Sequence, residues 1–227
     1  MNHAILLAGG IGSRMKMGIP KQYVEVKGIP VFIYSFRKFA AHPDIDSITI
    51  VCAKEWASFI SEWIQKESFK GSVLLADAGI SRQHSIYNGL LAIQSLANDD
   101  DCVLIHDSVR PLFPLSNISD GILACQGGGA ALPVIAVKDA TYLSADGVTV
   151  SGILPRHEMF SGQSPECFNY KQYLSAHSLF SDDELAQIRG SSELAFRAGL
   201  TVRLIPGADY NFKITTIEDL RSFELLV

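Results

Sequence analysis

The sequence has little of what marks a nucleic-acid binder or a membrane protein. Only 19% of its 227 residues are charged, Lys+Arg number 19 against 24 Asp+Glu, and no run of five basic residues occurs. Because duplex binding relies on clustered Lys and Arg, this balance argues against a nucleic-acid partner. No apolar stretch approaches the ~18 residues of a membrane span. The first residues are also too short and uncharged a segment for a signal peptide.

Cysteine is equally sparse. Cys52, Cys102, Cys125 and Cys167 lie far apart, without a C-x-x-C pair and without a histidine spaced to complete a zinc site. With 48% hydrophobic residues, a chain of this length buries a full core without disulfides or a structural metal. We therefore expect a reduced, cytoplasmic protein with one domain over residues 1–227.

What the sequence does contain is a regular rhythm. Short β-branched runs alternate with amphipathic stretches, which predicts an α/β fold with a mostly parallel sheet and helices on both faces. We expect strands at 3–8, 47–53, 72–77, 102–106, 130–137 and 201–205. Helices are expected at 30–41, 54–65, 82–96, 116–125, 170–180 and 183–198, and from Thr216 onward.

The rhythm changes after Val137. Residues 138–153 alternate apolar and polar side chains around Ala145-Asp146-Gly147, which is a hairpin signal. This pattern predicts a projecting β-arm at about 138–155. A hairpin of this size cannot carry its own core, so we expect it to dock on a second subunit and form a homodimer.

A glycine-rich loop follows the first expected strand. It reads Leu-Ala-Gly-Gly-Ile-Gly-Ser-Arg-Met over residues 7–15, and Pro-Lys-Gln follows at 20–22. Glycines at a strand's carboxyl end let backbone N–H groups approach phosphate oxygens. A tight turn is the simpler interpretation of the glycines, but Arg14 and Lys21 favour phosphate. A Rossmann dehydrogenase is the rival, yet it requires an acidic residue closing the second strand, which ends Val51-Cys52-Ala53.

Two further segments place charged residues beside expected strands. His106-Asp107 ends a buried strand, where a carboxylate is costly unless it is paired or binds metal. Asp107 could hold a Mg²⁺ that bridges triphosphate oxygens, with Arg110 reaching an anion, or it could cap a turn and pair with Arg110. Lys213 lies between Phe212 and Ile214, so we expect it to point into a polar pocket. Arg156 is the remaining candidate cation, or else an ordinary exposed arginine.

Together these segments resemble the cytidylyltransferase family that includes 2-C-methyl-D-erythritol 4-phosphate and ribitol-5-phosphate cytidylyltransferases. The resemblance covers nearly the whole chain. It rests on the glycine loop with Pro-Lys-Gln, on Gly79 with Arg82, Ser85 and Gly89-Leu90, on His-Asp-Ser-Val-Arg-Pro at 106–111, on Gln-Ser-Pro-Glu-Cys-Phe at 163–168, and on Asn-Phe-Lys-Ile-Thr at 211–215.

By this resemblance the chain would have a Rossmann-like, nucleotidyltransferase-type fold and would transfer CMP from CTP to a polyol phosphate, releasing pyrophosphate. The implied catalytic cations are Arg14, Lys21 and Lys213. The implied CTP-binding residues are Ala8, Gly9, Gly10, Gly12, Gly79, Ser85 and Asp107. Asp107 and Asp209 would hold Mg²⁺, while Arg110, Lys213 and the partner's Arg156 would bind the second substrate.

Several motifs look more like the ribitol-phosphate branch, so ribitol 5-phosphate is the expected acceptor and 2-C-methyl-D-erythritol 4-phosphate the alternative. A non-catalytic nucleotide-binding regulatory module is the third possibility. Three positions depart from the family's usual pattern. Arg189-Gly190-Ser191-Ser192 stands where a Thr-Asp segment is usual, and Ala140 replaces a threonine. Ile80 replaces an aspartate that reads cytosine in some relatives, which leaves base contacts to backbone groups and Ser85.

Overall fold

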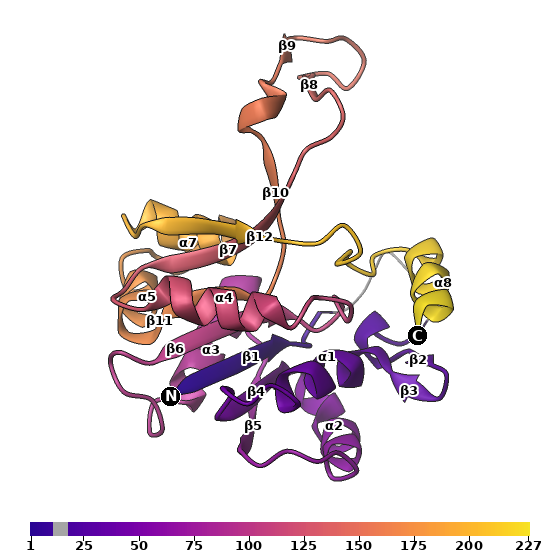
Figure 1. The fold of residues 1–227 in the computed structure, drawn as a ribbon, viewed down its shortest axis with the longest axis vertical. Helices are drawn as coiled ribbons and strands as arrows, with labels where there is room; N and C mark the ends of the chain where they lie inside the picture. The colour runs from indigo at the N-terminus through magenta and orange to yellow at the C-terminus, as the bar shows by residue number, and fades with distance from the viewer. Residues whose placement is uncertain (11–17) are drawn as a thin grey trace.

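The computed structural model describes residues 1–10 and 18–227. Its centre is an eight-stranded sheet in the order β10-β7-β11-β6-β1-β4-β5, with β12 paired to β7 (Figure 1). The strands are β1 (Asn2–Leu7), β4 (Ser47–Cys52), β5 (Ser72–Asp77), β6 (Cys102–Asp107), β7 (Ala130–Ala136), β10 (Phe160–Gly162), β11 (Glu166–Asn169) and β12 (Val202–Pro206).

Parallel pairing dominates the sheet. β1 lies between β4 and β6, β5 continues beyond β4, and all three of these contacts are parallel, as is that of β12 with β7. β11 joins the two halves by pairing antiparallel with both β6 and β7. The prediction of an α/β fold with a mostly parallel sheet is confirmed. Consequently the carboxyl ends of β1, β4, β5 and β6 meet at one edge, where such sheets bind ligands.

Helices cover both faces because the strands alternate their apolar side chains between them. In β1, Ala4 and Leu6 belong to one core cluster and Ile5 to the other. The first cluster packs under α1 (Val31–Ala40), α2 (Ala57–Ile64) and α4 (Ser116–Cys125). The second packs under α3 (Arg82–Ala92), α5 (Tyr170–His177), α6 (Asp182–Gln187) and α7 (Ser191–Arg197).

The last helix anchors the segment that carries Lys213. α8 (Ile217–Leu226) begins at a capping box in which Thr216 and Asp219 exchange hydrogen bonds, and its Phe223 is fully buried with Ile214 and Val109. The short strands β2 (Glu25–Val26) and β3 (Ile29–Pro30) pack near it through Val26. Three short 3₁₀ helices complete the fold: η1 (Lys21–Tyr23), η2 (Lys54–Trp56) and η3 (Arg156–Glu158).

Two of the expected helices are corrected by the structure. The prediction of one helix over 183–198 is wrong, because the chain breaks between α6 and α7 at Ile188, which is extended with ψ 120°. Glu193 then accepts the backbone N–H groups of Arg189 and Gly190 and starts α7 anew. The helix expected to reach residue 96 ends at Ala92, and residues beyond it form turns.

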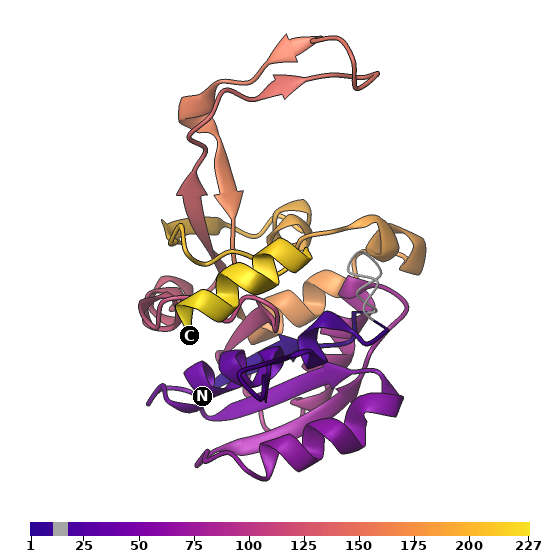
Figure 2. The ribbon, with the colours of Figure 1, turned by 90° about the vertical axis from the view of Figure 1, so that its right-hand side faces the viewer.

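The expected β-arm is present and projects away from the body of the molecule (Figures 1 and 2). Its outer part is a short hairpin in which β8 (Tyr142–Leu143) pairs with β9 (Gly152–Ile153). At its base β10 pairs with β7. The Asp146 carboxylate closes the tip by accepting the backbone N–H groups of Val148 and Thr149. Throughout residues 1–10 and 18–227, no helix has both the length and the apolar character needed to cross a membrane.

Candidate functional site

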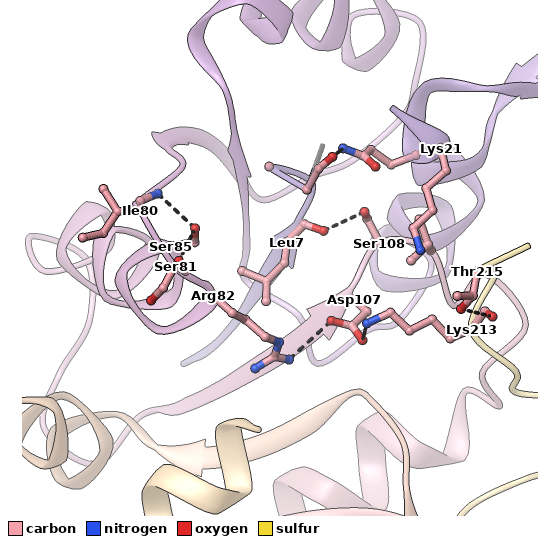
Figure 3. A pocket seen from close by; sticks show the side chains of 15 residues that line it. Leu7, Lys21, Ile80, Ser81, Arg82, Ser85, Asp107, Ser108, Lys213 and Thr215 are labelled. Atoms are coloured by element: carbon pink, nitrogen blue, oxygen red, sulfur yellow. Dashed lines mark hydrogen bonds and ion pairs between the residues drawn. The ribbon is translucent and has the colours of Figure 1, made fainter. Parts of the chain in front are cut away.

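A cavity of about 460 Å³ opens at the carboxyl edge of the sheet, beside the ends of β1 and β6 (Figure 3). Its wall brings together segments from the beginning, the middle and the end of the chain. Seven predicted site residues line it, namely Gly9, Gly10, Lys21, Gly79, Ser85, Asp107 and Lys213. Ile80, Ser81, Arg82, Gln22, Ser108 and Thr215 also line it.

Asp107, the last residue of β6, is surrounded by cations. Lys213 Nζ lies 2.7 Å from Asp107 Oδ2, and Arg82 Nη2 lies 3.3 Å from Oδ1. Arg110 Nε lies 3.8 Å from Oδ2. Burial alone would raise the pKa of Asp107, but Arg82, Lys213 and Arg110 hold it far below its usual range. Asp107 is therefore ionised at any working pH.

The cavity as a whole carries surplus positive charge. Among the described residues that line it, Lys21, Arg82 and Lys213 are cations and Asp107 is the one carboxylate. Figure 3 shows Arg82 reaching Asp107 from one side of the cavity and Lys213 from the other. A concave, partly desolvated site with this balance attracts multiply charged anions such as phosphates.

Hydrogen bonds from η1 fix the described part of the glycine loop. Gln22 Nε2 donates to the carbonyl oxygens of Ala8 at 2.6 Å and Gly10 at 2.7 Å, and the Tyr23 hydroxyl also donates to Ala8 O. A Cβ on Gly9 would lie 2.5 Å from Ala78 Cβ, whereas one on Gly10 would meet no atom of the described residues within 4 Å. Gly9 thus permits close packing, and Gly10 has space on the side of the described residues.

The opposite wall is a loop closed by Ser85. The Ser85 hydroxyl accepts the Gly79 backbone N–H at 2.9 Å and donates to Ser81 O at 2.9 Å. A Cβ on Gly79 would lie 2.4 Å from His84 Cβ, so only glycine fits. The single hydroxyl proton of Ser85 is used inside the loop, which leaves the Ser85 oxygen and main-chain groups to face a ligand. Ile80 is 88% exposed beside them.

The buried His106 is connected to the Asp107 backbone through the Ser164 hydroxyl. The Asp107 backbone N–H donates to Ser164 Oγ at 3.2 Å, and Ser164 Oγ lies 2.9 Å from His106 Nδ1. His106 Nε2 lies 3.2 Å from Arg110 O. Because the Arg110 carbonyl can only accept, His106 carries its proton on Nε2, and Nδ1 then accepts the Ser164 hydroxyl proton. Burial lowers the pKa of His106 to about 3, so it stays neutral.

Comparison with known proteins agrees with this site. The family model for 2-C-methyl-D-erythritol 4-phosphate cytidylyltransferase (IspD) matches residues 2–227. The chain belongs to this family. The resemblance inferred from the motifs is confirmed. Members of the IspD family are cytidylyltransferases, so the expectation of an enzyme is confirmed as well.

Individual relatives carry two different substrate names. A ribitol-5-phosphate cytidylyltransferase of Lactiplantibacillus plantarum is 34% identical, over 100% of this chain and 98% of the relative. A 2-C-methyl-D-erythritol 4-phosphate cytidylyltransferase of Clostridium kluyveri is 33% identical, over 96% and 93%. The solved structure of 4-diphosphocytidyl-2C-methyl-D-erythritol synthase from Anaerococcus prevotii superimposes with a TM-score of 0.83 at 25% identity, covering 100% of this chain and 95% of that one.

Within this IspD-family site, four predicted residues do not line the cavity. Ala8 is buried, and its carbonyl oxygen is already occupied by Gln22 and Tyr23. Arg110 lies behind Asp107 and donates to Asn211 O at 2.8 Å. The Asp209 carboxylate is 65% exposed and pairs with Lys138 Nζ at 2.7 Å, so the structure does not bring it to the cavity with Asp107. Arg156 lies on η3 in the arm and donates to Lys138 O. Gly12 and Arg14 lie outside the described residues.

The site also contains residues to which the sequence reasoning assigned no role in the IspD-family chemistry. Arg82 was noted only as part of a motif, yet its guanidinium lines the cavity and contacts Asp107. Gln22 belongs to the Pro-Lys-Gln motif, and its burial at 3% exposure was not foreseen. The signal for both was position: Gln22 follows Lys21 in η1, and Arg82 opens α3 between Gly79 and Ser85.

Proposed function

We propose that the protein transfers the cytidylyl group from CTP to a polyol phosphate, giving a CDP-polyol and pyrophosphate. The whole chain would act as one nucleotidyltransferase domain in the cytoplasm. The observation that carries this proposal is the cavity lined by Lys21, Arg82, Lys213 and Asp107, in a chain that the IspD family model matches over residues 2–227. Three cations in one partly buried cavity suit a triphosphate and a second phosphate.

In this reaction the acceptor's phosphate oxygen attacks the α-phosphorus of CTP. A new O–P bond forms, the bond between the α-phosphorus and its bridging oxygen breaks, and pyrophosphate carries away the electron pair. Backbone N–H groups of Gly9 and Gly10, with Lys21 and Arg14, would hold the triphosphate. Gly79 and Ser85 would contact cytosine. No side chain of the cavity needs to act as a nucleophile, because positioning and charge neutralisation provide the acceleration.

A divalent cation, Mg²⁺ by our proposal, fits the donor set at Asp107. The described residues hold no preformed group of three or more metal-ligating side chains. Mg²⁺ usually takes only one or two carboxylates and completes its shell with substrate phosphates and water, so a lone Asp107 suffices. Bound there, the cation would neutralise charge on the triphosphate. Asp107 would hold it once Lys213, now on Oδ2, turns toward the second substrate.

We propose ribitol 5-phosphate as the acceptor, with 2-C-methyl-D-erythritol 4-phosphate as the alternative. The relative from L. plantarum, 34% identical and matched over the whole chain, is named for ribitol 5-phosphate. The C. kluyveri relative at 33% is named for the other acceptor, so the margin is small. Lys213 of the same subunit and the partner subunit's Arg156 would bind the acceptor's phosphate. Arg110 would hold Asp107 and the Lys213 segment in place, because it lies beside the Asp107 carboxylate and donates to Asn211 O.

The arm would dock on a second copy of the chain and form a homodimer. Its apolar side chains support this, because Tyr142, Val148 and Ile153 are 55%, 86% and 72% exposed. Exposed apolar groups clustered on one thin projection are typical of an interface. Sedimentation at micromolar concentration tests the dimer, and a monomer would contradict it.

The deciding experiment measures pyrophosphate release from CTP and Mg²⁺, with ribitol 5-phosphate and 2-C-methyl-D-erythritol 4-phosphate at equal concentration. We expect release with both CTP and an acceptor present, and a higher kcat/KM for ribitol 5-phosphate. A preference for the erythritol compound would reverse the acceptor assignment. CTP binding without release on either acceptor would favour the non-catalytic nucleotide-binding module.

A further inference from the structure

A second buried carboxylate, that of Glu166, lies outside the cavity lining and accepts hydrogen bonds from the serine pair Ser191 and Ser192. Glu166, at the start of β11, is 6% exposed. Its Oε2 accepts the Ser192 backbone N–H at 2.8 Å and the Ser192 hydroxyl at 2.7 Å. Its Oε1 accepts the Ser191 hydroxyl at 2.8 Å. Both oxygens of this buried carboxylate are therefore fixed in direction by the first residues of α7.

Arg82 connects this carboxylate to the cavity. Its Nη1 donates to Ser191 Oγ at 2.7 Å. Its Nη2 lies 3.5 Å from Glu166 Oε1 and 3.3 Å from Asp107 Oδ1. One guanidinium group thus bridges a carboxylate outside the cavity wall and the carboxylate on it. Arg82 keeps its charge despite burial, because Asp107 and Glu166 raise its pKa.

The start of α7 is itself anchored on α3. Gln83 Nε2 donates to Gly190 O at 2.9 Å, and the Tyr173 hydroxyl donates to Ser191 O. Arg82 and Gln83 are consecutive at the beginning of α3, so one helix end holds both the side chain of Ser191 and the backbone before it. These contacts fix Ser191 and Ser192 on α3 and α5. The two serines in turn hold the Glu166 carboxylate in one position relative to Arg82.

We infer that Glu166, with Ser191 and Ser192, is a positioning residue for the transfer reaction, acting through Arg82. Without Glu166, the guanidinium would keep its bond to Ser191 but lose the buried negative charge that balances it on that side. The Arg82 guanidinium would then be free to move with the Asp107 carboxylate, and it would no longer fix the orientation of that carboxylate. This inference rests on the proposed function, because the reaction that Asp107 serves is the proposed one.

The consequence is specific to the arrangement of Asp107. Lys213 holds Oδ2 and Arg82 holds Oδ1, so the carboxylate plane is set by two cations on opposite sides of the cavity. Among the described residues, the hydrogen bonds of Glu166 go to Arg82, Ser191 and Ser192, and none goes to Gly9, Gly10, Gly79 or Ser85, which the proposal assigns to CTP. A defect in Glu166 should therefore slow the transfer step and leave CTP binding nearly unchanged.

The test is a double-mutant cycle between Glu166→Gln and Arg82→Met. We expect Glu166→Gln to lower kcat about 10- to 100-fold, the range for losing a hydrogen bond to a charged group, with KM for CTP changed less than about threefold. In the Arg82→Met background, Glu166→Gln should have no further effect on kcat. A wild-type kcat in Glu166→Gln, or losses that multiply independently in the double variant, would overturn the inference.

Glu193→Gln is the matched control. Glu193 is also a carboxylate at the start of α7, where it caps Arg189 and Gly190 and pairs with Arg197, away from Arg82. We expect its kcat to remain that of the wild type. If Glu166→Gln does not fold, Ser192→Ala removes one of the four hydrogen bonds to Glu166. It should lower kcat about threefold, again only when Arg82 is present.

A readout without turnover separates this inference from the proposed function. In protein labelled with ¹⁵N-arginine, the Arg82 guanidinium should give a slowly rotating signal in the wild type and lose it in Glu166→Gln. If the wild type transfers to no polyol phosphate but this signal behaves as expected, the proposed function fails and the role of Glu166 in holding Arg82 stands. An unchanged Arg82 signal in Glu166→Gln would refute that role.

Discussion

Lys213 Nζ lies 2.7 Å from Asp107 Oδ2, although the two residues are 106 positions apart in the chain. Lys213 precedes α8, and Asp107 ends β6. The ion pair therefore ties the C-terminal segment to the central strand at the point where the cavity opens. Arg82 and Arg110 also lie beside the Asp107 carboxylate. If Lys213 turns toward a substrate, the buried carboxylate therefore still has two cationic partners.

Replacing Lys213 by alanine should separate binding from transfer. Lys213→Ala should lower kcat by about 10²- to 10³-fold, as for the loss of one preorganised charge in a transition state. The Kd for CTP should change less than about threefold, because our proposal assigns the triphosphate to Lys21, Gly9 and Gly10. Calorimetry for CTP and pyrophosphate release for turnover give the two numbers.

Lys138→Ala is the matched control for that variant. Lys138 pairs with Asp209 on the surface, and its side chain is 71% exposed. Its loss should leave both CTP binding and kcat at wild-type values. An equal fall in CTP binding and kcat for Lys213→Ala would show that its assignment to the second substrate is wrong.

His106 should make the protein less stable in mild acid. Burial, the largest effect, lowers its pKa in the folded state to about 3 from an ordinary 6.5. The unfolded chain therefore binds a proton between these values that the folded chain does not, and stability falls as pH falls from about 6.5 toward 3. From pH 7 to pH 5 this one group should cost about 2 kcal/mol of unfolding free energy.

Urea unfolding of the wild type and of His106→Gln at both pH values measures this contribution. Glutamine can donate to Arg110 O and accept from Ser164 but does not titrate. The free-energy gap between the two proteins should shrink by about 2 kcal/mol on going from pH 7 to pH 5. A constant gap would mean that folding does not lower the pKa of His106.

The parallel half of the fold was predictable because a short apolar run in the sequence marks each of its strands. β1, β4, β5 and β6 are short apolar runs that begin and end within a residue or two of the predicted limits. β10 and β11 were missed because they have only three and four residues, too few to show a pattern of alternating apolar and polar side chains. The break between α6 and α7 was missed because both halves have helical patterns. Ile188 is extended, and Glu193 accepts the backbone N–H groups of Arg189 and Gly190 at the start of α7.

The candidate site was predictable where glycine or charge stood at the end of a strand. Gly9, Gly10, Lys21 and Asp107 were found in this way. The support of Arg82 by Glu166 was not, because the two are 84 residues apart and only the antiparallel insertion of β11 beside β6 brings them together. Ser85 was assigned to the base, but the use of its proton by Ser81 O depends on loop geometry that no residue pattern records.

Two glycines of the cavity should respond differently to a methyl group. Gly79→Ala would place Cβ 2.4 Å from His84 Cβ and 2.6 Å from its backbone carbon, so the loop must shift. We expect a loss of about 1–3 kcal/mol in stability and a clear fall in CTP affinity. The methyl group of Gly10→Ala meets no atom of residues 1–10 and 18–227 within 4 Å, and we expect an unchanged Tm.

Gly10→Ala is then the informative variant, because any effect on CTP arises from the ligand and not from the fold. If the triphosphate lies against Gly10, the added methyl group should weaken CTP binding about tenfold or more. Thermal unfolding and calorimetry on the same samples measure both properties. Wild-type CTP affinity in Gly10→Ala would place the phosphates elsewhere in the cavity.

The proposed homodimer predicts that two inactive variants can restore activity to each other. If Lys213 acts in its own subunit and Arg156 acts in the neighbouring one, Arg156→Ala and Lys213→Ala should each lower kcat by about 10²- to 10³-fold as pure dimers. Mixed after dissociation, half of the dimers should contain one copy of each. In such a dimer one cavity has both cations and the other has neither, so about a quarter of all sites should be active. Pyrophosphate release after mixing measures the recovery, and mixing either variant with itself is the control. No recovery in dimers shown by mass to be mixed would mean that Arg156 does not reach across to its neighbour's cavity.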